Sequence, residues 1–194
     1  MSGLLSSDRW CVYNDWPGKR QLCWAHVKRN WDKQVDRGGG AARVGRAWRA
    51  VQDRVFELWH LFRGGGCTRA ELVQRMLPVM GDALRVLEMG RRTRDRKLIR
   101  FCERLTKLYV YLWTFIKVDG VEPTNNQAER VQRRAVLWRR RSFGCHSADG
   151  CRFVERILTV VETLRQKKRS VLAFLYDAIT AYRSGQPSPR LVMG

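Results

Sequence analysis

The spacing of hydrophobic residues separates a short opening with strand character from a long series of amphipathic helices. Small and apolar residues at 3–7 predict a strand that ends at Asp8. A cluster of turn-forming residues follows at 14–18. Residues 20–27 fit either a second short strand or the start of a helix that continues through Trp31, and the pattern leaves both open.

Three helices are predicted after the glycines at 38–40, because apolar residues then recur every three to four positions. The glycines at 64–66 end the first helix, and Thr68 with Glu71 forms a capping box that opens the second. We expect Pro78 to kink the second helix. The third is expected from about residue 93 to residue 117. The three apolar faces carry Val44, Trp48, Val51, Val55, Leu58, Trp59 and Phe62; Leu72, Met76, Met80, Leu84 and Leu87; and Leu98, Phe101, Leu105, Leu108, Leu112 and Phe115.

Three more helices are predicted beyond a linker at 120–123. Thr124 or Asn125 caps a helix that contains Glu129 and runs to about Arg139. The next begins near Ser147 or Asp149, and Ser170 caps the last. The buried positions expected on these last two helices are Phe153, Ile157, Val161 and Leu164, then Val171, Phe174, Leu175, Ala178 and Tyr182. The predicted fold class is therefore mainly α with a short β remnant.

Positive charge is the strongest compositional signal. Lys and Arg number 38 against 18 Asp and Glu, a formal net charge of +20. Such an excess favours a polyanionic partner, because contacts with phosphates release condensed counterions. The alternative is a basic surface that reflects only a preference for arginine. No stretch of uninterrupted apolar residues reaches the ~20 needed to span a membrane, so we expect a cytoplasmic protein.

The six cysteines do not form a dense framework, and buried free thiols are the expected state. Cys23 and His26 could form half of a zinc site, with Cys145, His146 and Cys151 as the rest. The spacing differs from closed zinc sites, so we treat a thiolate metal site as the weaker interpretation.

Two acidic residues are the candidates for chemistry. Asp8 follows the first strand, and Glu129 lies in the first turn of a capped helix. Carboxylates that converge from such elements bind Mg²⁺ well, since hard cations prefer oxygen ligands. Taken alone, each has a simpler explanation: aspartate commonly forms turns after strands, and a first-turn glutamate complements the helix dipole.

Several motifs, in order along the chain, resemble transposases of the insertion-sequence sixty-six family. They are Ser7-Asp8-Arg9-Trp10 with Tyr13; Gln21-Leu22-Cys23-Trp24-Ala25-His26 with Arg29; Gly120-Val121-Glu122-Pro123-Thr124-Asn125-Asn126 with Ala128-Glu129-Arg130; Ser142-Phe143-Gly144 with Gly150; and Thr163-Leu164-Arg165-Gln166. The likeness covers nearly the whole chain. Departures from the family pattern include Trp10, where Tyr is common, and Arg140-Arg141, where Lys-Gly is usual.

The resemblance implies a ribonuclease-H-like catalytic domain with two aspartates and one glutamate that bind divalent metal. Asp8 matches the second aspartate and Glu129 the glutamate, so both are expected as catalytic and metal-binding residues for Mg²⁺ or Mn²⁺. The organisation implied is a core remnant at 1–36, a helical insertion at 37–118, a return to the core at 119–168, and a terminal helix and tail at 169–194. The core is expected to be truncated, because the family's first aspartate lies well upstream of the motif around Asp8.

The expected function is that of a transposase fragment that binds transposon ends and target DNA in a bacterial nucleoid but does not cleave DNA alone. It is expected to associate with itself or with a full-length transposase. The alternative is a basic DNA-binding or regulatory protein that acts on a full-length transposase.

Arginines around Glu129 are expected to contact phosphates; the simpler explanation is a solvated basic face with pairs to Glu122 and Asp149. The expected DNA-binding residues are Arg130, Arg133, Arg134, Arg139, Arg140 and Arg141. His26 either approaches the active site or packs on the core.

Overall fold

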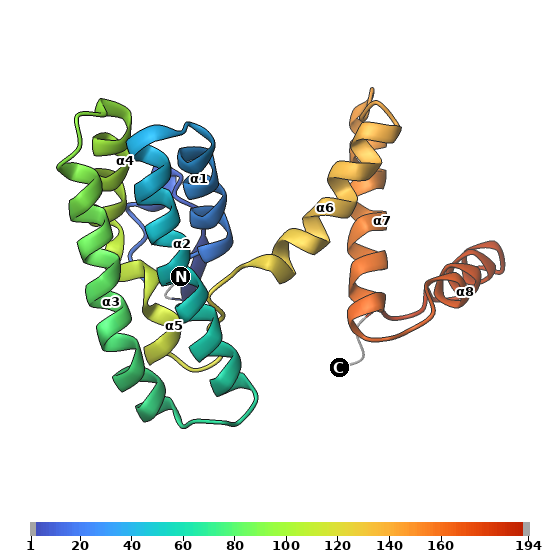
Figure 1. Cartoon of the computed structure of the whole chain (residues 1–194). Helices are drawn as coiled ribbons and strands as arrows, with labels where there is room; N and C mark the ends of the chain where they lie inside the picture. Colours follow the sequence, from blue (N-terminus) through green and yellow to red (C-terminus); the bar gives the residue numbers. More distant parts are fainter. Residues whose placement is uncertain (1–2, 192–194) are drawn as a thin grey trace. The chain divides into compact units, whose positions relative to one another are not determined.

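The computed structural model describes residues 3–191, apart from the side chains of residues 127, 128 and 131. The chain divides into two compact units, Met1–Asn126 and Gln127–Gly194 (Figure 1). Both are mainly helical, as predicted. The described residues contain one small sheet, and it belongs to the first unit.

Strands β1 (Leu4–Ser7) and β2 (Lys19–Leu22) pair in parallel, with Leu4 opposite Lys19 and Ser7 opposite Leu22. A short 3-10 helix, η1 (Cys11–Tyr13), lies in the connection between them. Helix α1 (Trp24–Asp36) then begins almost directly after β2. Both alternatives for residues 20–27 are thus partly right: the segment is a strand up to Leu22 and a helix from Trp24.

Helices α2 (Gly39–Arg63) and α3 (Arg69–Arg91) form a long antiparallel pair (Figure 1). The predicted capping box is confirmed, because Thr68 accepts from the Glu71 backbone N–H while the Glu71 side chain accepts from that of Thr68. Helix α3 continues on both sides of Pro78.

The prediction of one helix over residues 93–117 is wrong. Helix α4 (Arg96–Lys107) is followed by the 3-10 helix η2 (Tyr109–Leu112) and the short helix α5 (Thr114–Lys117). The polar groups of this segment bond to the strand region instead of continuing one helix. The Leu112 carbonyl accepts from Trp24 Nε1 at 2.8 Å, and Thr114 Oγ1 donates to the Arg20 carbonyl at 2.5 Å. These contacts fix the end of the helical layer to β2.

A cluster of aromatic side chains forms the centre of the first unit. Trp24, Trp31 and Trp48 have no exposed surface. The Trp48 ring stacks on Trp31 at 5.0 Å and on Trp24 at 5.9 Å between centroids. Phe101 meets Trp31 edge-on, and Trp113 meets Trp24 in the same way. Because large aromatics dominate core energetics, this cluster joins α1, α2 and α4 to the junction between η2 and α5.

The second unit consists of α6 (Asn126–Arg141), α7 (Ala148–Gln166) and α8 (Val171–Arg183). Ser147 caps α7 by accepting from the Gly150 N–H, and Ser170 caps α8 by accepting from that of Ala173. Ser147, not Asp149, is therefore the cap of α7, and the predicted cap of α8 is confirmed.

Several positions predicted to be buried are exposed. In the first unit, Leu84 is 45% exposed, while its neighbour Ala83 is buried. In the second unit, Phe153 is 65% and Tyr182 85% exposed, and Leu164 is the one buried residue among the described side chains. Periodicity identifies the apolar face of a helix, but only packing decides whether another element covers it.

Candidate active site

Asp8 lies immediately after β1, where the sequence predicts it. Its side chain is half-buried, and Oδ1 accepts the backbone N–H of Trp10 at 2.9 Å. This bond closes a local turn of the kind that aspartate commonly forms. The other carboxylate oxygen makes no hydrogen bond or ion pair with the residues that the structure describes, so it is available to a cation.

Arg20, on β2, fixes the backbone around Asp8. Its side chain is only 2% exposed, and its guanidinium donates to the Asp8 carbonyl at 2.8 Å and to Ser7 Oγ at 2.9 Å. Two further bonds reach the Tyr13 carbonyl and Asn14 Oδ1. Burial lowers the pKa of Arg20, opposed by the nearby Tyr111, Asp8 and Tyr13. One arginine thus anchors both ends of the loop that carries Asp8.

Sequence reasoning did not identify this role of Arg20. The signal in the sequence was a single arginine in a segment that could form a strand. In the structure, the two residues that follow it, Gln21 and Leu22, are fully buried. A buried charge needs several hydrogen-bond partners, and the parallel pairing of the strands supplies them.

Arg9 adds a second cation beside Asp8. Its guanidinium donates to Asn30 Oδ1 at 2.8 Å and lies 4.8 Å from the centre of the Phe101 ring. Burial and the nearby Arg104 lower the pKa of Arg9, and Asp8 opposes them. Arg9 and Arg20 therefore place two cationic side chains close to the Asp8 carboxylate.

Glu129 lies in the first turn of α6, as predicted, and its side chain is half-buried. Asp8 belongs to the first unit and Glu129 to the second. That the two carboxylates converge on one metal site is therefore still a prediction.

The six arginines proposed for DNA binding all lie on α6, and all are exposed. Within the described part of the chain, Arg134 alone among them forms an ion pair, at 2.6 Å from Glu162. The acids expected to neutralise this face pair elsewhere: Glu122 with Arg63, and Asp149 with Arg152. Among the described residues of the second unit, the pair to Asp149 that the simpler explanation includes does not form, and the six arginines of α6 are exposed.

The cysteines are free, as expected, but Cys11, Cys145 and Cys151 are exposed instead of buried. A sulfur–imidazole pair does occur in the first unit, where Cys23 Sγ and a ring nitrogen of half-buried His26 lie within 4.8 Å. Within either unit taken by itself, the described residues bring no three histidine, cysteine or acidic side chains together around a common point. That His26 approaches the active site stays a prediction.

The charge of the chain and its candidate acids together indicate a protein that acts on nucleic acid. A strongly basic chain with a carboxylate at a strand end and an arginine-covered helix is typical of proteins that act on nucleic acid. The family model described as Transposase IS66 family matches residues 1–152, which is most of the chain. The chain belongs to this family. The model's name also designates a DDE transposase, which indicates the use of divalent metal.

No curated protein and no solved structure matches the chain. Among the described residues, no helix combines the length and the apolar character that a membrane span requires.

Proposed function

We propose that this chain provides the carboxy-terminal part of a ribonuclease-H-like transposase core, with residues 37–118 as a helical insertion. The observation that carries the proposal is the position of Asp8. It follows a strand in a parallel pair, keeps one oxygen available, and lies with Glu129 inside the region that matches the family. The long helices α2 and α3 between the two acids fit the place of the insertion.

Asp8 and Glu129 are the residues that would hold Mg²⁺ or Mn²⁺. Carboxylate oxygens suit such hard cations, and the hydrogen bonds of Arg20 hold the Asp8 backbone in place. When bound, divalent metal in such sites activates an attacking oxygen and stabilises the leaving oxygen of a phosphodiester. In the family's reaction, water attacks a phosphodiester at a transposon end, the strand breaks, and the freed hydroxyl then attacks target DNA.

The arginines of α6 bind DNA in this proposal. Each guanidinium can contact a phosphate through two parallel hydrogen bonds. All six side chains are exposed, and five of them form no ion pair with a carboxylate among the described residues, so little must be broken before they contact DNA.

Metal binding tests the proposed pair of acids. Titration of the protein with Mn²⁺, followed by electron paramagnetic resonance, should show weaker binding in both Asp8→Asn and Glu129→Gln. Asp15→Asn, at an exposed position in the loop after η1, is the matched control and should bind as the wild type does. A shared site would be contradicted if only one of the two site variants, or neither of them, bound Mn²⁺ more weakly than the wild type.

DNA cleavage is the second test. A protein of these 194 residues carries matches for two of the three family acids, so we expect it to bind family end sequences without nicking them in Mg²⁺ or Mn²⁺. Robust nicking that disappears in Glu129→Ala would refute this expectation. Interference with a full-length transposase, measured as reduced DNA cleavage by that transposase when this chain is added, would favour the regulatory alternative.

A further inference from the structure

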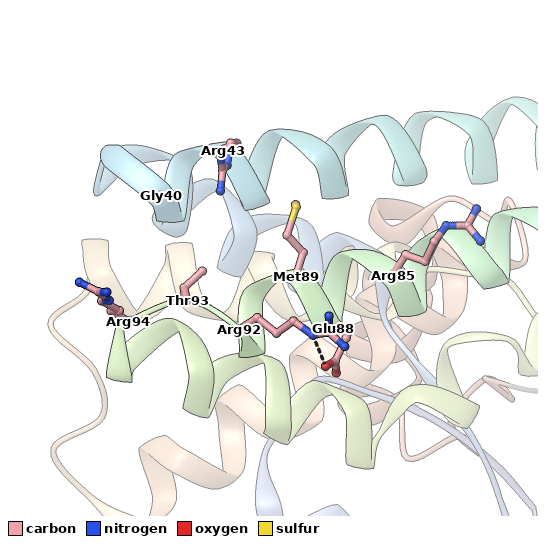
Figure 2. A pocket seen from close by; sticks show the side chains of 8 residues that line it. All are labelled: Gly40, Arg43, Arg85, Glu88, Met89, Arg92, Thr93 and Arg94. Carbon is pink, nitrogen blue, oxygen red and sulfur yellow. Dashed lines mark hydrogen bonds and ion pairs between the residues drawn. The ribbon is translucent and has the colours of Figure 1, made fainter.

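A second basic site lies in the first unit, away from α6 in the sequence. A cavity of about 720 Å³ opens where the amino-terminal end of α2 meets the carboxy-terminal end of α3 and the turn that follows (Figure 2). This volume is within the range of ligand-binding pockets in proteins. The residues that line it are Gly40, Arg43, Arg85, Glu88, Met89, Arg92, Thr93 and Arg94.

The lining has a large excess of positive charge, with four arginines and a single carboxylate. That carboxylate, Glu88, is already engaged, because Oε1 pairs with Arg92 at 2.9 Å and Oε2 with Arg91 at 3.1 Å. Arg43 and Arg94 form no ion pair with the described residues. In the part of the chain that the structure describes, these two cations at the cavity therefore have no counter-charge.

The position of Arg43 argues against a purely structural role. It lies one turn inside α2, near the positive end of the helix dipole, where a cation is unfavourable. The first turn of α2 has no acidic residue, and its amino-terminal cap, Gly38, supplies no side-chain acceptor. The N–H groups of that turn and Arg43 thus favour the same kind of ligand, an anion.

Some of the arginines at the end of α3 are explained by the stability of the helix alone. Arg91 and Arg92 complement the negative end of that helix and pair with Glu88. This explanation does not extend to Arg94, which follows the helix, or to Arg43. In Figure 2, Arg43 comes from α2, and Arg92 and Arg94 come from the opposite rim.

We infer that this cavity binds backbone phosphates of DNA, as a contact of the helical insertion separate from the arginines of α6. The choice of DNA among polyanions rests on the proposed function. Guanidinium groups from two sides suit the planar, bidentate recognition of phosphate. Met89 and Gly40 leave part of the lining uncharged, which gives room for the sugar between successive phosphates.

The test measures binding of a fluorescent duplex over a series of KCl concentrations. The double variant Arg43→Gln/Arg94→Gln should bind more weakly. Its affinity should also depend less steeply on salt. The slope of log affinity against log salt should decrease in magnitude by about two, because each phosphate that an arginine neutralises contributes about 0.9 to that magnitude. The control, Arg75→Gln/Arg100→Gln, removes two arginines of α3 and α4 that do not line the cavity. It should leave the slope close to that of the wild type.

Gly40→Asp gives an independent variant with a low risk of misfolding. A Cβ at Gly40 would meet no atom within 4 Å, and a carboxylate in the first turn is favoured by the helix dipole. We expect an unchanged melting temperature or a slight rise, with weaker DNA binding. A mononucleotide at equal phosphate concentration should compete poorly, and full competition would overturn the assignment to a DNA strand.

The outcomes separate this inference from the proposed function. A steep salt dependence in the wild type, with equal slopes in the cavity variant and its control, would overturn the cavity alone. A wild type without salt-dependent DNA binding would overturn both.

Discussion

Replacing Arg20 tests whether one buried arginine holds the loop of the candidate site. In Arg20→Met, the apolar stem is roughly preserved while all four hydrogen bonds of the guanidinium are lost. Arg20→Lys keeps the charge, but a single ammonium cannot reproduce the planar fork that reaches several acceptors together. The two variants therefore separate the charge of Arg20 from its geometry.

The expected loss of folding stability depends on which hydrogen-bond acceptors of Arg20 have no other donor. Asn14 is exposed and can turn to water, and the Asp8 carbonyl keeps a bond from Ser7 Oγ at 3.0 Å. Ser7 Oγ and the Tyr13 carbonyl lose a charged donor, at about 1–3 kcal/mol for each acceptor left unsatisfied. Relief from burying the guanidinium offsets part of this cost. We expect about 3 kcal/mol for Arg20→Met and roughly half of that for Arg20→Lys.

Urea unfolding, followed by tryptophan fluorescence, measures these losses. With an m-value of about 2 kcal/mol/M, the midpoint of Arg20→Met should fall by roughly 1.5 M. Binding of Mn²⁺ should weaken as well, although Asp8 itself is unchanged. A loss below about 1 kcal/mol in Arg20→Met, or full stability in Arg20→Lys, would refute this account of the loop.

Three further predictions concern the helical layer. Gly90→Ala should destabilise the protein by about 1–2 kcal/mol in thermal melts, because the added Cβ would clash with Cys102 Sγ; the same change in a Cys102→Ala background should be nearly neutral. Burial raises the pKa of the Cys102 thiol to about 12, so a thiol reagent at a pH of about 8, near the ordinary pKa of an exposed thiol, should label the exposed cysteines and leave Cys102 unmodified until the protein unfolds. Burial raises the pKa of Asp32, but hydrogen bonds from Arg49 and Lys28 outweigh it and hold that pKa below its ordinary value of 3.8. The stability difference between the wild type and Asp32→Asn should therefore be full above pH 3.8 and decline as the pH falls further; a difference that is constant with pH would contradict the pairing.

Local patterns in the sequence predicted most of the helices, the caps at Thr68 and Ser170, and the elements on which the two acids lie. The capping box at Thr68, the cap at Ser170 and the strand before Asp8 are confirmed, because each depends on residues within a few positions of one another. The family motifs are also local, and the family match confirms the resemblance they carried.

Tertiary contacts decided where the helical pattern ends, what Arg20 anchors and where a cavity forms. The segment at 108–117 leaves the helical pattern because the Leu112 carbonyl and the Thr114 hydroxyl bond to Trp24 and β2, some ninety residues earlier in the chain. The anchoring role of Arg20 and the cavity beside Arg43 likewise need elements that are distant in sequence. Periodicity states which face of a helix is apolar, but burial and the pairing of charges arise only when separate elements pack together.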